Sequence, residues 1–130
     1  MQLGNFSLSL SVKDIGTSKE FYEALGFSII DGNEKEGWLI LKNGETNIGL
    51  FQGMFEQNII TFNPGWVQNG KELETFTDIR DIQKKLKESH INFKQEVKDD
   101  TGPASFMITD PDGNTILVDQ HVEGSKKKDE

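Results

Sequence analysis

An internal repeat is the feature that most constrains the fold. Asp14-Ile15 and Asp78-Ile79 lie 64 positions apart, and the same offset aligns Tyr22 with Leu86. In each half, a helical pattern follows the aspartate, and strand-like segments joined by a two-residue turn come next. A repeat on this scale predicts two copies of one supersecondary unit.

The first half has the pattern of a βαβββ unit. Apolar residues from Phe6 to Val12 alternate with serines, which predicts a half-buried strand. Asp14, Thr17 or Ser18 can cap a helix over about 17–24. Three strands are predicted after it, at residues 27–32, 37–42 and 46–52, with Asn43-Gly44 as the turn between the last two.

The second half predicts the same order. A strand at 72–77 is followed by a helix that Asp78 caps, and then by strands at 92–97, 104–109 and 114–122. The intervening stretch fits neither template and is interpreted as an ordered linker with an added strand at 58–62. The chain is therefore predicted to be one domain over 1–122, with module one at about 3–52, a linker at about 53–71, module two at about 72–122, and a charged tail at 123–130.

Composition excludes several classes of protein. The length of 130 residues suits one domain, and the absence of cysteine excludes disulfides and thiolate metal sites. A net charge of −8 argues against nucleic acid as a partner. The sequence shows no signal peptide and no apolar run that could span a membrane, so a cytoplasmic protein with no membrane partner is expected.

Two segments carry a family resemblance. One is the hairpin Asp110-Pro111-Asp112-Gly113-Asn114 with its following strand, and the other is Leu10-x-Val12-x-Asp14-Ile15-x-x-Ser18-x-x-Phe21-Tyr22-x-x-Leu25-Gly26-Phe27. Together they resemble the vicinal oxygen chelate superfamily, which includes glyoxalase I, extradiol dioxygenases and bleomycin-resistance proteins. The resemblance implies an α+β fold in which two tandem βαβββ modules form a curled mixed sheet around a cleft. It also implies a homodimer.

Metal-dependent members of that superfamily bind a divalent ion at four inward positions. The resemblance places these positions at Ser7, Gly49, Glu72 and Leu117. Divalent ions require several oxygen or nitrogen donors, and of the four residues only Glu72 is a good ligand. Neither the usual metal site nor any other cofactor is therefore expected, and Leu117 also replaces the carboxylate base of the glyoxalase I mechanism.

A rearranged site is the alternative. Asp119 and His121 are two residues apart on the last strand and therefore share a side, so with Glu72 they could bind a divalent metal or act as acid and base. The competing interpretation is that both are ordinary polar residues at the end of a sheet.

Without a metal, the inward positions would line a pocket for a small organic molecule. Small residues at Ser7 and Gly49 are expected to leave space there, and Phe106 is grouped with Leu117 on the lining. Aromatic residues of the lining could equally be ordinary core. The predicted lining consists of Ser7, Trp38, Gly49, Phe51, Phe62, Trp66, Phe106, Leu117 and Asp119.

Two functions remain open from the sequence. One is a binding protein of the bleomycin-resistance kind, for which the acidic composition would suit a cationic ligand. The other is a lyase or dioxygenase-like enzyme with an atypical metal site that includes Glu72, Asp119 and His121.

Overall fold

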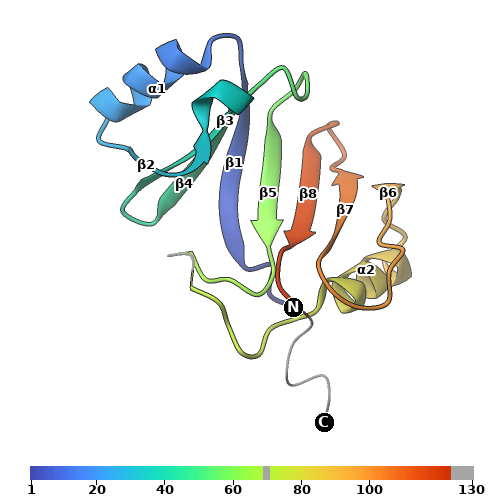
Figure 1. The fold of residues 1–130 in the computed structure, drawn as a ribbon. Helices are drawn as coiled ribbons and strands as arrows, with labels where there is room; N and C mark the ends of the chain where they lie inside the picture. Colours follow the sequence, from blue (N-terminus) through green and yellow to red (C-terminus); the bar gives the residue numbers. More distant parts are fainter. Residues whose placement is uncertain (69–70, 124–130) are drawn as a thin grey trace. The chain divides into compact units, whose positions relative to one another are not determined.

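The structure, a computed structural model, describes residues 1–68 and 71–123 (Figure 1). Within this part the chain forms eight strands, two α-helices and one short 3-10 helix, so the predicted α+β class is confirmed. Neither described helix, at ten residues each, is long and apolar enough to cross a bilayer. The chain divides into two compact units. We call Ser7–Ile59 the N-terminal unit, and Met1–Phe6 with the described chain from Ile60 onward the C-terminal unit.

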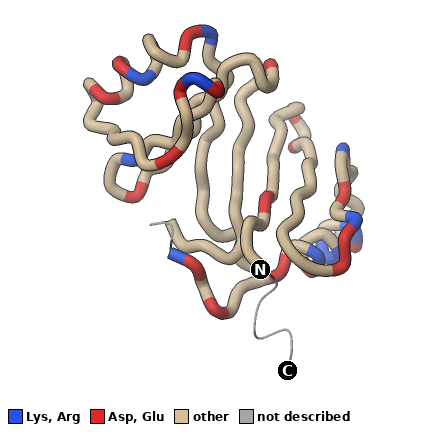
Figure 2. The backbone as a smooth tube through the Cα atoms, in the orientation of Figure 1, with Lys and Arg blue, Asp and Glu red and all other residues tan. Residues whose placement is uncertain are grey.

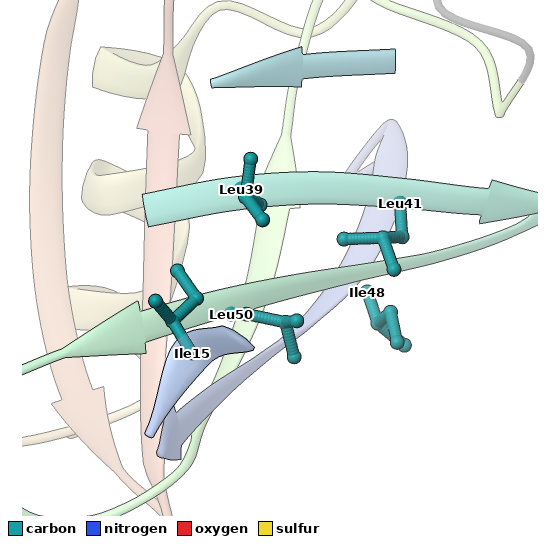
Figure 3. Close-up of a cluster of buried hydrophobic side chains, with 5 residues drawn as sticks. All are labelled: Ile15, Leu39, Leu41, Ile48 and Leu50. Atoms are coloured by element: carbon teal, nitrogen blue, oxygen red, sulfur yellow. The ribbon is translucent and has the colours of Figure 1, made fainter. Parts of the chain in front are cut away.

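The N-terminal unit packs one helix on one face of its strands. Its strands are ordered β2-β3-β4-β1, with β1 parallel to β4 and the other neighbours antiparallel. The buried core contains Ile15 of the helix and alternate residues of β3 and β4, namely Leu39, Leu41, Ile48 and Leu50 (Figure 3). The elements are β1 (Asn5–Val12), α1 (Ile15–Ala24), β2 (Ser28–Asn33), η1 (Glu34–Glu36), β3 (Trp38–Asn43) and β4 (Thr46–Gln52).

The C-terminal unit repeats this arrangement with the strand order β5-β8-β7-β6. Ile79 and Ile82 of the helix pack against Phe106 and Val118 of the strands, and all four side chains are buried. Leu3, from the beginning of the chain, joins the same core. The elements are β5 (Ile59–Asn63), α2 (Ile79–Glu88), β6 (Phe93–Gln95), β7 (Ala104–Thr109) and β8 (Thr115–Gln120).

The helix beginnings show that the repeat extends to individual hydrogen bonds. Asp78 is the N-cap of α2, as predicted, and Asp14, one of the three caps predicted for the first helix, is the N-cap of α1. A glutamine at the end of the unit's last strand then accepts the first helical N–H in each case. Gln52 Oε1 lies 2.8 Å from the backbone N of Ile15, and Gln120 Oε1 lies 2.8 Å from that of Ile79.

The helix ends repeat as well. Phe27 donates its backbone N–H to Tyr22, and Ile91 donates to Leu86, again 64 positions on. The residue before each donor has positive φ, at 100° for Gly26 and 64° for His90. This is the Schellman geometry, which favours glycine because a side chain is strained there. The sequence obscured the equivalence because histidine occupies the second position.

One predicted strand is wrong. Residues 72–77 form no strand, and Glu72 makes only an isolated bridge with Trp66. The first strand of the C-terminal unit is instead β5, in the stretch interpreted as a linker, where the added strand was predicted. The β-branched and aromatic run Ile59-Ile60-Thr61-Phe62 suits a strand better than the charged stretch after it. Within the predicted linker and tail, residues 69–70 and 124–130 lie outside the described residues.

Candidate functional site

The face of the N-terminal unit that points away from α1 carries four of the nine predicted lining residues, namely Ser7, Trp38, Gly49 and Phe51. Strand alternation places them opposite the leucine and isoleucine core, and the pairing register arranges them in rows across β3, β4 and β1. The first row is Trp38, Phe51 and Ser11; the second is Ile40, Gly49 and Ser9; the third contains Lys42 and Asn47.

The ring of Phe51 lies over Gly49. A Cβ atom added at Gly49 would be only 2.5 Å from Cε2 of Phe51 and 3.3 Å from Cδ1 of Ile40. Phe55 supports the ring, with ring centroids 5.3 Å apart. The expectation that Gly49 leaves an open space is therefore wrong, because an aromatic side chain already fills it.

The serines of β1 differ in their surroundings. Ser9 is buried and Ser7 is half-buried. Ser11 donates its hydroxyl to the carbonyl of Phe55 at 2.7 Å, and its backbone N–H binds Oδ1 of Asn58 at 2.9 Å. Ser11 thus fixes the segment after β4, which in turn holds Phe55 against Phe51.

In the C-terminal unit, Phe106 and Leu117 lie on opposite faces. Phe106 pairs with Val118 and is fully buried against α2, whereas Leu117 pairs with Met107 on the other face. The grouping of Phe106 with the pocket lining is therefore wrong, and this side chain is core. Alternation along β7 separates Phe106 from Met107, but it does not show which of the two faces α2 covers.

Asp119, His121 and Trp66 come together in the C-terminal unit. Nε2 of His121 lies 2.9 Å from Oδ2 of Asp119, and the imidazole lies 5.2 Å from the Trp66 ring, measured between centroids. The hydrogen bond to Asp119 raises the pKa of His121 above its ordinary value of 6.5, and partial burial opposes this rise. Both side chains remain partly exposed, so the pair is open to solvent.

The remaining predicted residues lie elsewhere in the same unit. Glu72 is exposed, and its link to the Asp119–His121 pair is an isolated β-bridge with Trp66. Phe62 packs against Phe6 with ring centroids 5.6 Å apart.

Among the described residues, no three of histidine, cysteine, aspartate and glutamate are grouped so that they could hold a metal ion. Glu72, Asp119 and His121 therefore do not assemble as a metal site.

The residues at the resemblance-derived metal positions do not fit a divalent ion. Ser7 offers a hydroxyl, Gly49 offers no side chain and is covered by a phenyl ring, and Leu117 is apolar. With Glu72 outside any strand, these positions lack the set of carboxylate and imidazole donors that such an ion requires.

Comparison with known proteins decides the family. The profile of the Glyoxalase/Bleomycin resistance protein/Dioxygenase superfamily matches residues 5–118. The chain belongs to this superfamily. It is similar to Virulence protein STM3117 of Salmonella typhimurium, with 31% identity over 120 residues, which cover 88% of this chain and 82% of the relative.

Two solved structures share the superfamily fold with this chain. A glyoxalase/bleomycin resistance protein/dioxygenase superfamily member from Vibrio splendidus 12B01 has 19% identity and a TM-score of 0.64, over 89% of this chain and 97% of its own. A protein described as NAD-dependent benzaldehyde dehydrogenase from Legionella pneumophila has 15% identity and a TM-score of 0.66, over 89% and 98%. At these identities the likeness concerns the fold alone.

Sequence reasoning missed one residue on the site face. Lys42 lies two positions from Ile40 and four from Trp38 on β3, so the alternation that selected Trp38 also places Lys42 on that side.

Proposed function

We propose that this superfamily member binds a small organic molecule without the divalent metal that its metal-dependent relatives use. The observation that supports this proposal is the phenyl ring of Phe51 over Gly49. Where the resemblance implies a glutamate, the chain has an aromatic surface in place of a donor. Such a surface stabilises the body of an organic ligand and offers nothing to a hard cation.

The aromatic side chains near the site suit this role. Trp38 and Phe51 are neighbours in the first row of the N-terminal unit, and both are half-buried. Binding sites for small molecules combine apolar walls of this kind with a few polar groups.

A neutral aromatic probe tests the proposal. N-phenyl-1-naphthylamine should bind the chelator-treated protein and accept energy from tryptophan, and Trp38→Phe should remove most of that signal. Because the ligand would not contact a metal, added divalent ions should leave the affinity unchanged. Binding that appears only after metal is restored would contradict the proposal, as would failure of the probe to bind at all.

A second candidate function rests on the hydrogen bond between Asp119 and His121. A carboxylate that orients an imidazole and raises its pKa is an arrangement used for proton transfer. We propose as the alternative that this pair serves as acid and base in a lyase-type reaction. Formation of S-lactoylglutathione that is lost in Asp119→Asn and His121→Asn would support it. Unchanged turnover in both variants would exclude the pair.

A further inference from the structure

The third row of the N-terminal face has a different chemistry from the first two. Lys42 pairs with Asn47 across β3 and β4 and with Ser28 across β3 and β2. Nζ of Lys42 donates to Oδ1 of Asn47 at 3.0 Å, and Asn47 is only 5% exposed. A buried amide therefore fixes where the ammonium group of Lys42 lies.

Lys42 supplies the charge of the three adjoining strands of this face. It is the only charged residue in the sequences of β1, β3 and β4, and Figure 2 shows the charged residues concentrated on helices and connecting segments. The edge strand adds one carboxylate to this face, because Asp31 pairs with Ile40. Asp31 is exposed and accepts the backbone N–H of Gly32 at 2.8 Å. The net charge of −8 therefore does not describe this surface.

The spacing of the rows sets the size of a matching ligand. At about 3.3 Å per residue along a strand, Lys42 lies roughly 7 Å from Ile40 and roughly 13 Å from Trp38. The Phe51 ring leans towards the second row, over Gly49. A two-ring aromatic body over the first two rows would thus bring an attached acidic group to the third.

We propose that this face binds an aromatic molecule that carries an acidic group, with Lys42 as the partner of that group. The inference rests on the proposed binding function and narrows its ligand to aromatic anions. The acidic composition suggested a cationic ligand, whereas Lys42 favours an anionic one. Asn47 acts as a positioning residue for Lys42, and Trp38 and Phe51 contact the aromatic body.

Two fluorescent probes with the same aromatic body separate this inference from the general binding function. N-phenyl-1-naphthylamine is neutral, and 8-anilinonaphthalene-1-sulfonate adds one sulfonate. The wild type should bind the sulfonate probe about tenfold more tightly, because a charge-assisted hydrogen bond to Lys42 adds to the aromatic contact. This preference should decrease as salt is raised.

Variants of Lys42 identify the residue responsible. Lys42→Met should abolish the preference for the sulfonate probe, whereas Lys42→Arg should keep that preference. Lys35→Met removes the same charge from the exposed helix η1 and is the matched control, with no change expected. Asp31→Asn should increase the preference, because it removes the carboxylate on this face.

The outcomes are distinct. Equal affinities of wild type for the two probes, or a preference that survives Lys42→Met, would overturn the anion inference and leave the binding function standing. If neither probe binds, the proposed function itself fails. Urea unfolding of each variant establishes that it is folded. Should Lys42→Met be unfolded, the salt dependence of the wild-type preference and the Asp31→Asn result decide the question.

Discussion

Adding one methyl group at Gly49 should destabilise the protein by about 1–2 kcal/mol. The new Cβ would be 2.5 Å from Cε2 of Phe51 and 3.3 Å from Cδ1 of Ile40, so the phenyl ring must move by about 1 Å to reach ordinary contact. Overpacking of this kind costs about 1–3 kcal/mol. Replacing glycine by alanine within a strand recovers about 0.5–1 kcal/mol, which gives the net figure.

A double-mutant cycle assigns the cost to the ring. In a Phe51→Leu background the aromatic ring is gone, so Gly49→Ala should be neutral or slightly stabilising. The coupling free energy between the two positions should then equal the overpacking cost of about 1–3 kcal/mol. Urea unfolding measures each corner of the cycle, and an unchanged m-value shows that the comparison is valid. The lost contact with Phe55 cancels, because it is absent from both Phe51→Leu corners.

Gly16→Ala is a suitable control. A Cβ there would meet its nearest atoms at 3.4 Å, within a helix where alanine is favoured, so this change should stabilise slightly. If Gly49→Ala proves neutral in the wild type, or costs the same with and without the Phe51 ring, then the ring does not lie over Gly49. The proposal of metal-independent binding would lose its structural support.

Three further predictions concern capping and titration. His90→Gly should raise the free energy of unfolding by about 0.5–1 kcal/mol in urea, because glycine adopts the positive φ of 64° without strain. Gln120→Leu should lower the free energy of unfolding in urea by about 2–3 kcal/mol, because it leaves a buried backbone N–H unpaired. Gln52 is exposed, so Gln52→Leu should lower it by less than about 1 kcal/mol. Because the pKa of His121 is raised, its contribution to stability is full below about pH 6.5 and is lost as pH rises through the folded-state pKa. NMR titration should show the pKa of His121 falling towards 6.5 in Asp119→Asn. An unchanged pKa in that variant would contradict the assignment.

Much of the fold could be predicted because its signals are local. An aspartate cap acts on the next few amides, and alternation acts on the next few side chains, so the cap Asp78 and the bounds of β4 and β7 were predicted correctly, and Asp14 was among the caps predicted for the first helix. The position of the first strand of the C-terminal unit has no such local signal. The predicted strand at 72–77 assumed that the second half repeats the short strand-to-helix connection of the first half, but a long connection separates β5 from α2.

The site could be predicted only as far as side-chain periodicity reaches. The two-residue spacing of Asp119 and His121 correctly placed them on one side, within hydrogen-bond distance. Periodicity gives no information about which face a helix covers, and this explains the error at Phe106. Nor does it show how far a side chain leans along its strand. The position of the Phe51 ring depends on Phe55, from a segment that follows the strand.

The first six residues take part in a core that the rest of their repeat does not share. Leu3 packs with the helix α2, Gln2 donates its backbone N–H to Thr77, and both backbone groups of Phe6 bind the side chain of Gln68. A gene cut at the repeat boundary would therefore yield a second half lacking its own first segment. Separate expression of the two halves should succeed only if those six residues are grafted onto the later piece, so the boundary of the sequence repeat is not a boundary between independently folding units.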